Sequence, residues 1–353
     1  MDTQTLIFTN SVNEVISQAV GSLTFDKLYI LCDDNTQKQA LPLLNDFIAD
    51  NNVTVITIKA GDINKNIDSL SQVWMALSKE KATRKSLLIN LGGGMVTDLG
   101  GFAASTFKRG INFINVPTSL LGAVDAAVGG KTGINFNGLK NEIGVFSPAK
   151  CVIISTQFFK TLDNENLLSG YAEMLKHSLL ESDESLKKLL AFNPVTRDYD
   201  HLLSLLKESV EVKERVVKED PFEKGLRKAL NLGHTVAHSF ESYALSINKP
   251  ILHGYAVAWG VVCELILSHQ RCGFPKSALN EVADYVKSNY GVFYFTCKEY
   301  DTLYEFMKHD KKNESDSVNF TLLKSPGIIS LNQTATKEEI FVMLDIYRDL
   351  FNI

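Results

Sequence analysis

The stretch Leu91-Gly92-Gly93-Gly94-Met95-Val96-Thr97-Asp98 follows an apolar run at residues 86–91 and precedes a run that is compatible with a helix. A strand, a glycine turn and a helix in that order let backbone amides approach a pyrophosphate at the helix N-terminus. The stretch lacks the G-x-G-x-x-G spacing, so a nucleotide site and a plain glycine turn both stay open. Twelve of the 22 glycines lie between Gly92 and Gly144, which indicates a site built largely from backbone.

The residues around this stretch predict an α/β domain over residues 1–162. Short β-branched runs alternate with helix-like stretches, which is typical of β-α-β units and a parallel sheet. Strands are expected at residues 27–32, 53–58, 86–91, 112–116 and 151–155, and helices at residues 37–50 and 67–78. The binding crevice of such a sheet lies at the carboxyl ends of its strands.

From residue 163 to residue 353 the pattern changes to long helical periods, which predict a second domain that is mainly α. One strand-like pair, at residues 318–323 and 328–331, is joined by Lys324-Ser325-Pro326-Gly327 and predicts a hairpin. Helices are expected at residues 164–180, 199–220, 227–245, 254–272, 277–290 and 337–351.

Composition and charge exclude several classes of protein. The chain has 353 residues, of which 45% are hydrophobic and 22% charged, as in a globular protein of two domains. Its net charge of −5 argues against nucleic-acid partners and anionic membranes, which need a basic face. We find no apolar run long enough to span a bilayer and no basic leader, which predicts a cytoplasmic protein. The five cysteines are scattered and odd in number, which predicts reduced residues in the core.

Two further motifs suggest anion or ribose binding. Gly129-Gly130-Lys131-Thr132 resembles the end of a phosphate-binding loop, but Asp125 occupies the place of the first glycine, so that reading fails. A glycine-flanked lysine followed by Lys140 and Asn141 can still hold an anionic ligand, with a solvated loop lysine as the alternative. Asp33 ends a predicted strand, where its carboxylate would accept from a ribose or cap a helix.

Histidines concentrate in the helical half. His234 and His238 are four residues apart and share a helical face, His253 follows, and Glu173 lies in an apolar helix. Neutral imidazoles with a carboxylate suit Zn²⁺, and Fe²⁺ or Co²⁺ would also fit.

Five basic residues lie among these segments: Arg109, Lys176, Lys213, Arg227 and Lys312. If their side chains converge, they would bind a small polyanion such as a sugar phosphate bearing a carboxylate. The alternative is that each is a solvated surface residue, as most lysines are.

Seven segments in order make the chain resemble the sugar phosphate cyclases, and within them the 3-dehydroquinate synthase family. The resemblance extends from Asp33 to Lys312. The segments are GGGMVTDLGGFAASTFKRG at 92–110, VPTSLLGAVDAAVGGKTGIN at 116–135, KNEIGVF at 140–146, SGYAEMLKH at 169–177, LRKALNLGHTVAHSFE at 226–241, LHGYAVAWG at 252–260 and DKKN at 310–313.

The resemblance implies a Rossmann-like dinucleotide-binding domain and a helical metal-binding domain, with the active site in the cleft between them. It also implies a homodimer that uses NAD and Zn²⁺ or Co²⁺. The implied metal ligands are Glu173, His234 and His253. The implied NAD contacts are Asp33, Asp62, Lys65, Gly94, Met95, Val96, Thr97, Asp98, Thr118, Ser119, Lys140, Phe158 and Thr161. The implied substrate contacts are Arg109, Asp125, Lys131, Asn141, Lys176, Lys213, Arg227, Asn231, His238 and Lys312.

The implied reaction is the cyclisation of 3-deoxy-D-arabino-heptulosonate 7-phosphate to 3-dehydroquinate, by transient oxidation, phosphate elimination, reduction and aldol closure. Two positions depart from the family pattern: Asp62 stands where a glutamate is usual, and Asp163 where a proline is usual. Other sugar phosphate cyclases, a metal-dependent polyol dehydrogenase and an inactive nucleotide-binding protein are the alternatives. The chain retains both the implied metal ligands and the basic residues, which argues against an inactive nucleotide-binding protein.

Overall fold

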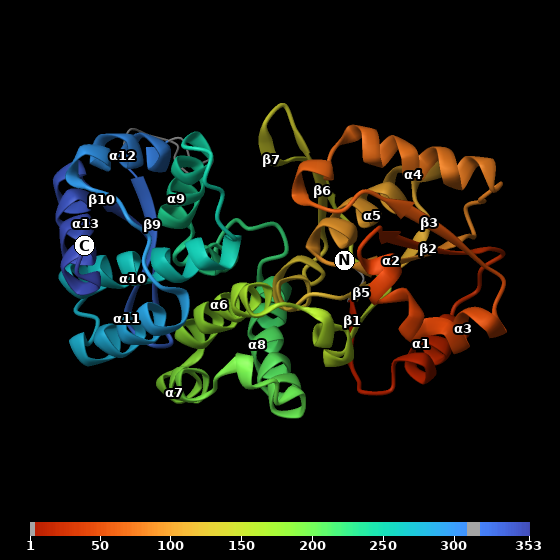
Figure 1. Ribbon diagram of the computed structural model, residues 1–353, viewed down its shortest axis with the longest axis horizontal. Coiled ribbons are helices and arrows are strands. Elements are labelled where there is room, and N and C mark those ends of the chain that lie inside the picture. The colour runs from red at the N-terminus through yellow and green to blue at the C-terminus, as the bar shows by residue number, and fades with distance from the viewer. Residues whose placement is uncertain (1–3, 309–317) are drawn as a thin grey trace. The chain divides into compact units, whose positions relative to one another are not determined.

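The computed structural model describes residues 4–308 and 318–353, which form two compact units (Figure 1). The first contains the chain up to Asp163 together with Arg197–Val210, and the second contains Asn164–Thr196 and Glu211–Ile353. Sequence analysis placed a single boundary after residue 162. The segment Arg197–Val210 lies with the first unit because Arg197 donates to the carbonyls of Lys160 and Leu162.

Within the described residues, the first unit contains a six-stranded parallel sheet in the order β1-β8-β5-β4-β2-β3. Strands β2 and β4 are buried along their whole length, as expected for a parallel sheet covered on both faces. The five expected strands are confirmed, and the structure adds β1, which was not expected. The strands are β1 (Thr5–Phe8), β2 (Leu28–Asp33), β3 (Val53–Ile58), β4 (Leu87–Gly92), β5 (Asn112–Pro117) and β8 (Cys151–Ile154).

The helix expected at residues 37–50 is wrong as a single element. The chain forms two short helices around a tight 3-10 turn at Leu41–Leu44, which has Pro42 in its first positions. Proline lacks an N–H donor and its ring clashes with the preceding turn of an α-helix, so a continuous helix cannot form here. The helices of this unit are α1 (Val12–Gly21), α2 (Thr36–Gln39), α3 (Asn45–Asp50), α4 (Ile67–Lys79) and α5 (Gly94–Thr106).

A hairpin that sequence analysis did not predict carries Lys131 and Asn141. Its strands are β6 (Lys131–Phe136) and β7 (Leu139–Phe146), which pair antiparallel. The two turn residues, Asn137 and Gly138, both have positive φ, 50° and 80°. Asn-Gly between two β-branched runs is the strongest short signal for such a turn, so this hairpin was predictable. All eight residues of β7 are exposed.

The second unit is mainly helical and is built around α10 (His253–Cys272), which is buried continuously from Ala256 to Ser268. The predicted C-terminal hairpin is confirmed as β9 (Val318–Ser325) and β10 (Ile328–Ala335). The other helices are α6 (Asn164–Glu181), α7 (Asp183–Ala191), α8 (Tyr199–Glu219), α9 (His234–Ser246), α11 (Lys276–Tyr290), α12 (Tyr300–Lys308) and α13 (Lys337–Phe351). Helix α8 contributes its first part to the first unit.

The helix expected at residues 227–245 is also wrong as a single element. A 3-10 turn at Leu226–Asn231 is separated from α9 by Gly233, whose φ is +82°. A side chain at Gly233 would lie 2.6 Å from the side chain of Val261 on α10. This left-handed break matters for function because the residue after it, His234, begins α9.

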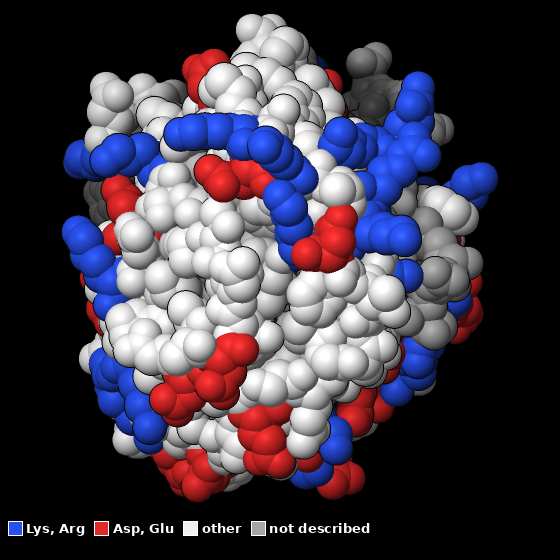
Figure 2. Space-filling view, turned by 90° about the vertical axis from the view of Figure 1, so that its right-hand side faces the viewer, with Lys and Arg blue, Asp and Glu red and all other residues white. Residues whose placement is uncertain are grey.

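On the face shown in Figure 2, many Lys and Arg side chains lie in the upper part, with some Asp and Glu among them, and further Asp and Glu side chains gather in the lower part. A broad surface without charged side chains lies between them. Among the described residues, no helix combines the length and the apolar content that crossing a bilayer requires.

Gly260→Ala tests the close approach of α10 to the start of α9. The added Cβ would lie 2.1 Å from the carbonyl oxygen of Gly233, so the helices must separate. We expect the free energy of unfolding to fall by about 1–3 kcal/mol, measured by urea denaturation and circular dichroism. Gly21→Ala is the matched control, because nothing lies within 4 Å of its new Cβ. Equal stability of the two variants would contradict the described packing.

Candidate active site

The site in the second unit begins with a buried ion pair on α6. Glu173 lies in a stretch that is buried from Leu167 to Leu180, and its side chain is 0% exposed. Lys176, one turn later on the same face, forms an ion pair with Glu173 Oε2 and is 1% exposed. A buried carboxylate is costly unless neighbouring groups compensate its charge, so the surroundings of Glu173 must supply that compensation.

Two histidines face the other oxygen of Glu173. His234 Nε2 lies 3.4 Å and His253 Nε2 lies 3.3 Å from Glu173 Oε1. His234 begins α9 and His253 begins α10, so both rings project from the first turn of a helix. One ligand atom from each of the three residues lies within 4.8 Å of the others. Three side chains from three helices therefore converge on one point.

Each imidazole has a second partner that orients its ring. His234 Nδ1 lies 3.2 Å from the carbonyl oxygen of Leu232, and His253 Nδ1 lies 3.4 Å from Glu241 Oε2. A proton on each Nδ1 leaves Nε2 as the electron-pair donor. Carbonyl and carboxylate partners of this kind are typical of histidines that ligate metals. Sequence analysis missed Glu241, although it ends the quoted segment 226–241.

The three groups have strongly shifted pKa values. Burial raises the pKa of Glu173, but the Lys176 ammonium and the two histidines outweigh it, so that pKa lies well below its usual range. Burial and Lys176 lower the pKa of His234 to about 4, which keeps its ring neutral. At His253 burial lowers the pKa, but the carboxylates of Glu173 and Glu241 outweigh it and raise that pKa to about 10. The carboxylate of Glu173 therefore stays ionised, as a metal ligand must be.

This donor set fits a divalent metal. Both oxygens of Glu173 are buried, and neither has a hydrogen-bond partner of good geometry among the described residues. Two imidazole nitrogens and a carboxylate are the ligands of catalytic zinc sites and also suit Co²⁺. His238 does not share this point with its ligand atoms, although its ring centroid lies 5.5 Å from that of His234. The candidate metal site therefore combines His234 with His253, and not with His238 as the H-x-x-x-H spacing alone would predict.

The first unit presents a different site, at the carboxyl edge of its sheet. Gly93 caps α5, so the free amides of the first turn of α5 point toward this edge. The residues of the expected NAD set follow the carboxyl ends of five parallel strands, which share one edge. They are Asp33 after β2, Asp62 and Lys65 after β3, Gly94 to Asp98 after β4, Thr118 and Ser119 after β5, and Phe158 and Thr161 after β8.

Lys65 organises this edge. It is buried, and its ammonium donates both to Asp98 at the start of α5 and to the side-chain oxygen of Asn141 on β7. Asn135 on β6 adds a second link, because its amide donates to Asp62 and its Oδ1 accepts from the backbone of Asn141. The β6–β7 hairpin is thus tied to the loop after β3. Sequence analysis missed Asn135, which no local signal distinguishes.

Asp33 holds the turn between β2 and α2. Its Oδ1 accepts from the backbone amides of Asn35 and Thr36, at 2.9 and 2.7 Å. Asn35, not Asp33, is the N-cap of α2. Elsewhere in the unit, Asp125 lies in the turn Gly122–Ala126 after β5, Lys131 begins β6, and Lys140 lies on β7.

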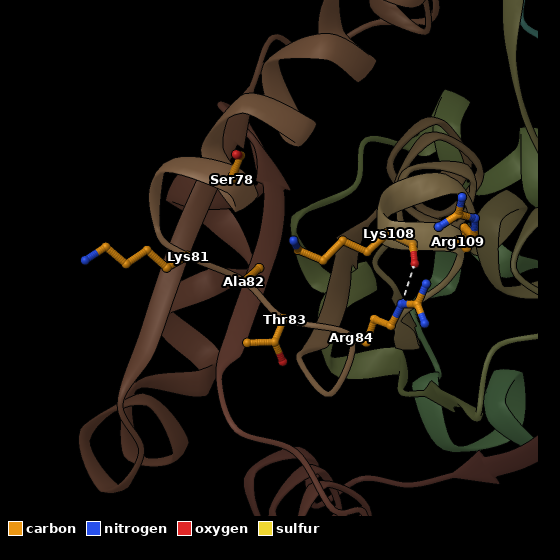
Figure 3. Close-up of a pocket in the computed structure, with 7 residues that line it drawn as sticks. All are labelled: Ser78, Lys81, Ala82, Thr83, Arg84, Lys108 and Arg109. Carbon is orange, nitrogen blue, oxygen red and sulfur yellow. Dashed lines mark hydrogen bonds between the residues drawn. The ribbon is translucent and has the colours of Figure 1, made fainter.

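Arg109 lies apart from the carboxyl edge. It precedes β5, and because Leu87 pairs with Asn112 the segments before β4 and β5 share the opposite, amino edge of the sheet. There Arg109 borders a depression of about 630 Å³ together with Arg84 and Lys108 (Figure 3). Arg84 donates to the carbonyl of Lys108 at 3.1 Å. The structure therefore does not bring Arg109 together with the other expected substrate contacts of this unit.

The remaining expected substrate contacts belong to the second unit. Lys213 on α8 and Arg227 are both buried. Arg227 donates to the carbonyl of Pro221, and Asn231 donates to Glu223 Oε1 at 3.0 Å. Arg227 and Asn231 lie in the 3-10 turn that leads into Gly233 and His234. Lys312 lies outside the described residues.

Comparisons with known proteins identify the family of the chain. Family models described as 3-dehydroquinate synthase N-terminal and C-terminal match residues 55–169 and 170–313. A 3-dehydroquinate synthase from Parabacteroides distasonis is 53% identical over 353 residues, which covers 100% of both chains.

Two solved structures share the fold. A 2-epi-5-epi-valiolone synthase from Streptomyces hygroscopicus subsp. jinggangensis, with NAD⁺ and Zn²⁺ bound, has a TM-score of 0.87 at 24% identity, covering 99% of this chain and 98% of its own. A 2-deoxy-scyllo-inosose synthase complexed with carbaglucose-6-phosphate, NAD⁺ and Co²⁺ has a TM-score of 0.82 at 20% identity, covering 96% and 95%. With the family models and the full-length relative, these findings show that the chain belongs to the 3-dehydroquinate synthase family.

Proposed function

We propose that the chain converts 3-deoxy-D-arabino-heptulosonate 7-phosphate to 3-dehydroquinate and phosphate, using NAD and a divalent metal. The convergence of Glu173, His234 and His253 carries this proposal, because binding a nucleotide alone would need no such cluster. In this assignment residues 1–162 bind NAD and residues 163–353 bind the metal and most of the substrate. Family membership and the retained basic residues support the choice of substrate.

The cofactors define what the residues must do. When bound, the metal would polarise a substrate hydroxyl and NAD⁺ would accept a hydride and later return it. Glu173, His234 and His253 would hold the metal, and the carboxyl edge of the first unit would hold NAD. Lys65 positions Asp98 and Asn141 at that edge through its two hydrogen bonds.

The basic and amide side chains would bind the two ends of the substrate. Oxidation to a ketone acidifies the neighbouring carbon, so the phosphate leaves by elimination, with one of its own oxygens taking the proton. Lysines hold such an anion by charge, and arginine grips a carboxylate with two parallel donors. We assign the phosphate to Lys131, Asn231, His238 and Lys312. The rest of the substrate is assigned to Asp125, Asn141, Lys176, Lys213 and Arg227. Arg109 is left out because it lies at the opposite edge of its sheet.

We also infer a homodimer located in the cytoplasm. The homodimer rests on the resemblance to the family. The location is supported by the five cysteines, all of which are free thiols, three of them buried.

Phosphate release from 3-deoxy-D-arabino-heptulosonate 7-phosphate tests the function directly. With catalytic NAD⁺ we expect release that a chelator abolishes and added Zn²⁺ or Co²⁺ restores. NADH absorbance should not accumulate, because the hydride returns to the substrate in each cycle. Faster phosphate release from another sugar phosphate than from this substrate would instead indicate a different sugar phosphate cyclase. Stoichiometric NADH formation from a simple polyol would favour a dehydrogenase.

His234→Ala tests the metal assignment. Loss of one ligand should reduce bound metal at least tenfold and turnover by about a thousandfold, which corresponds to about 4 kcal/mol of transition-state stabilisation. Metal content is measured by atomic emission after gel filtration. His201→Ala is the control, since His201 is an exposed histidine on α8. Normal metal content and turnover in His234→Ala would refute the assignment.

Lys131→Ala tests the phosphate assignment. Lys131 is exposed at the start of β6, so its loss should leave the thermal unfolding midpoint unchanged. We expect kcat/KM to fall by about a hundredfold or more, as when one anion-stabilising donor is removed. Lys85→Ala removes another exposed lysine of the same unit and should behave as wild type. An unfolded Lys131→Ala protein would indicate a structural role instead.

A further inference from the structure

A second buried carboxylate lies behind the histidine cluster. Glu264 lies near the middle of α10, is 0% exposed, and is surrounded in sequence by buried apolar residues. None of the motifs or substrate contacts considered above includes it. Burying a carboxylate without compensation is costly, so its partners explain why it is there.

Those partners are the backbone amides on either side of His234. Glu264 Oε2 accepts from the N–H of Gly233 at 2.7 Å, and Oε1 accepts from the N–H of Thr235 at 3.2 Å. A helix N-terminus carries unpaired donors and a partial positive charge, which an N-cap side chain normally satisfies. The N-cap of α9 is Gly233, which has no side chain. Glu264 performs the capping from another helix.

Helix α10 also carries His253, eleven residues before Glu264. Eleven residues are close to three full turns, so both side chains project from the same side of α10. Between them, Gly260 lets the carbonyl of Gly233 approach closely. Helix α10 therefore carries His253 itself and, through Glu264, binds the backbone on either side of His234.

We propose that Glu264 is a positioning residue, which sets His234 against Glu173 and His253 by holding the amides of Gly233 and Thr235. The inference rests on the proposed function, since it assigns a supporting group to that metal site. Only the carboxylate suits this task, because both of its oxygens accept. The amide of a glutamine would accept with its oxygen and present a donor to the second N–H.

Glu264→Gln is the test, with cobalt as the probe. Apoprotein is titrated with Co²⁺, and the visible absorption of the bound ion gives both its affinity and its coordination. We expect the dissociation constant to rise ten- to a hundredfold, as for other outer partners of metal ligands, with an altered spectrum. Excess Co²⁺ should restore turnover. If Glu264→Gln is insoluble, Glu264→Asp, whose shorter side chain cannot reach both amides, repeats the titration.

Leu265→Ala is the matched control. Leu265 follows Glu264 on α10 and is 0% exposed, so its truncation destabilises the same core without touching the amides. Its thermal unfolding midpoint should fall while its cobalt affinity and spectrum match wild type. If Glu264→Gln has the cobalt affinity and spectrum of wild type, the positioning role of Glu264 is refuted, whereas the assignment of the metal site still stands. If instead wild type binds no cobalt, or His234→Ala binds it equally well, the metal site itself is overturned, and this inference with it.

Discussion

The second unit is organised around one constraint, the burial of the Glu173 carboxylate in the apolar helix α6. An ionised carboxylate in such surroundings costs several kcal/mol unless charges and donors compensate it. Lys176 compensates one oxygen, and His234 and His253 face the other. Each of these histidines begins a helix, so the starts of α9 and α10 must be positioned accurately. The left-handed break at Gly233 and the capping carboxylate of Glu264 meet that requirement.

In the first unit, the candidate site is formed largely by backbone at the carboxyl edge of the parallel sheet. Parallel strands end at one edge, and the glycine turn after β4 brings the amides of α5 to that edge. The β6–β7 hairpin contributes Lys131 and Asn141, and the buried Lys65 joins Asn141 to Asp98. Polar side chains that are far apart in sequence are thus held together by a single ammonium group.

Much of this could be predicted from the sequence, because the alternation of β-branched and helical runs is local information. Strand β3 has the expected bounds, and the C-terminal hairpin was expected. Errors arose where one residue overrides periodicity, as at Pro42 and Gly233. The three convergent ligands were named from family resemblance, whereas spacing alone pointed to His238 as the partner of His234. Glu264 was not predictable, because its contacts span about thirty residues and resemble no local motif.

The central claim is that Glu173, His234 and His253 bind one divalent cation. The most direct measurement is anomalous X-ray diffraction from crystals grown with Co²⁺, recorded on both sides of the cobalt absorption edge. We predict one strong anomalous peak within ligand distance of Glu173 and of Nε2 of both histidines. A cobalt peak elsewhere, with the three side chains in contact only with one another, would contradict the account.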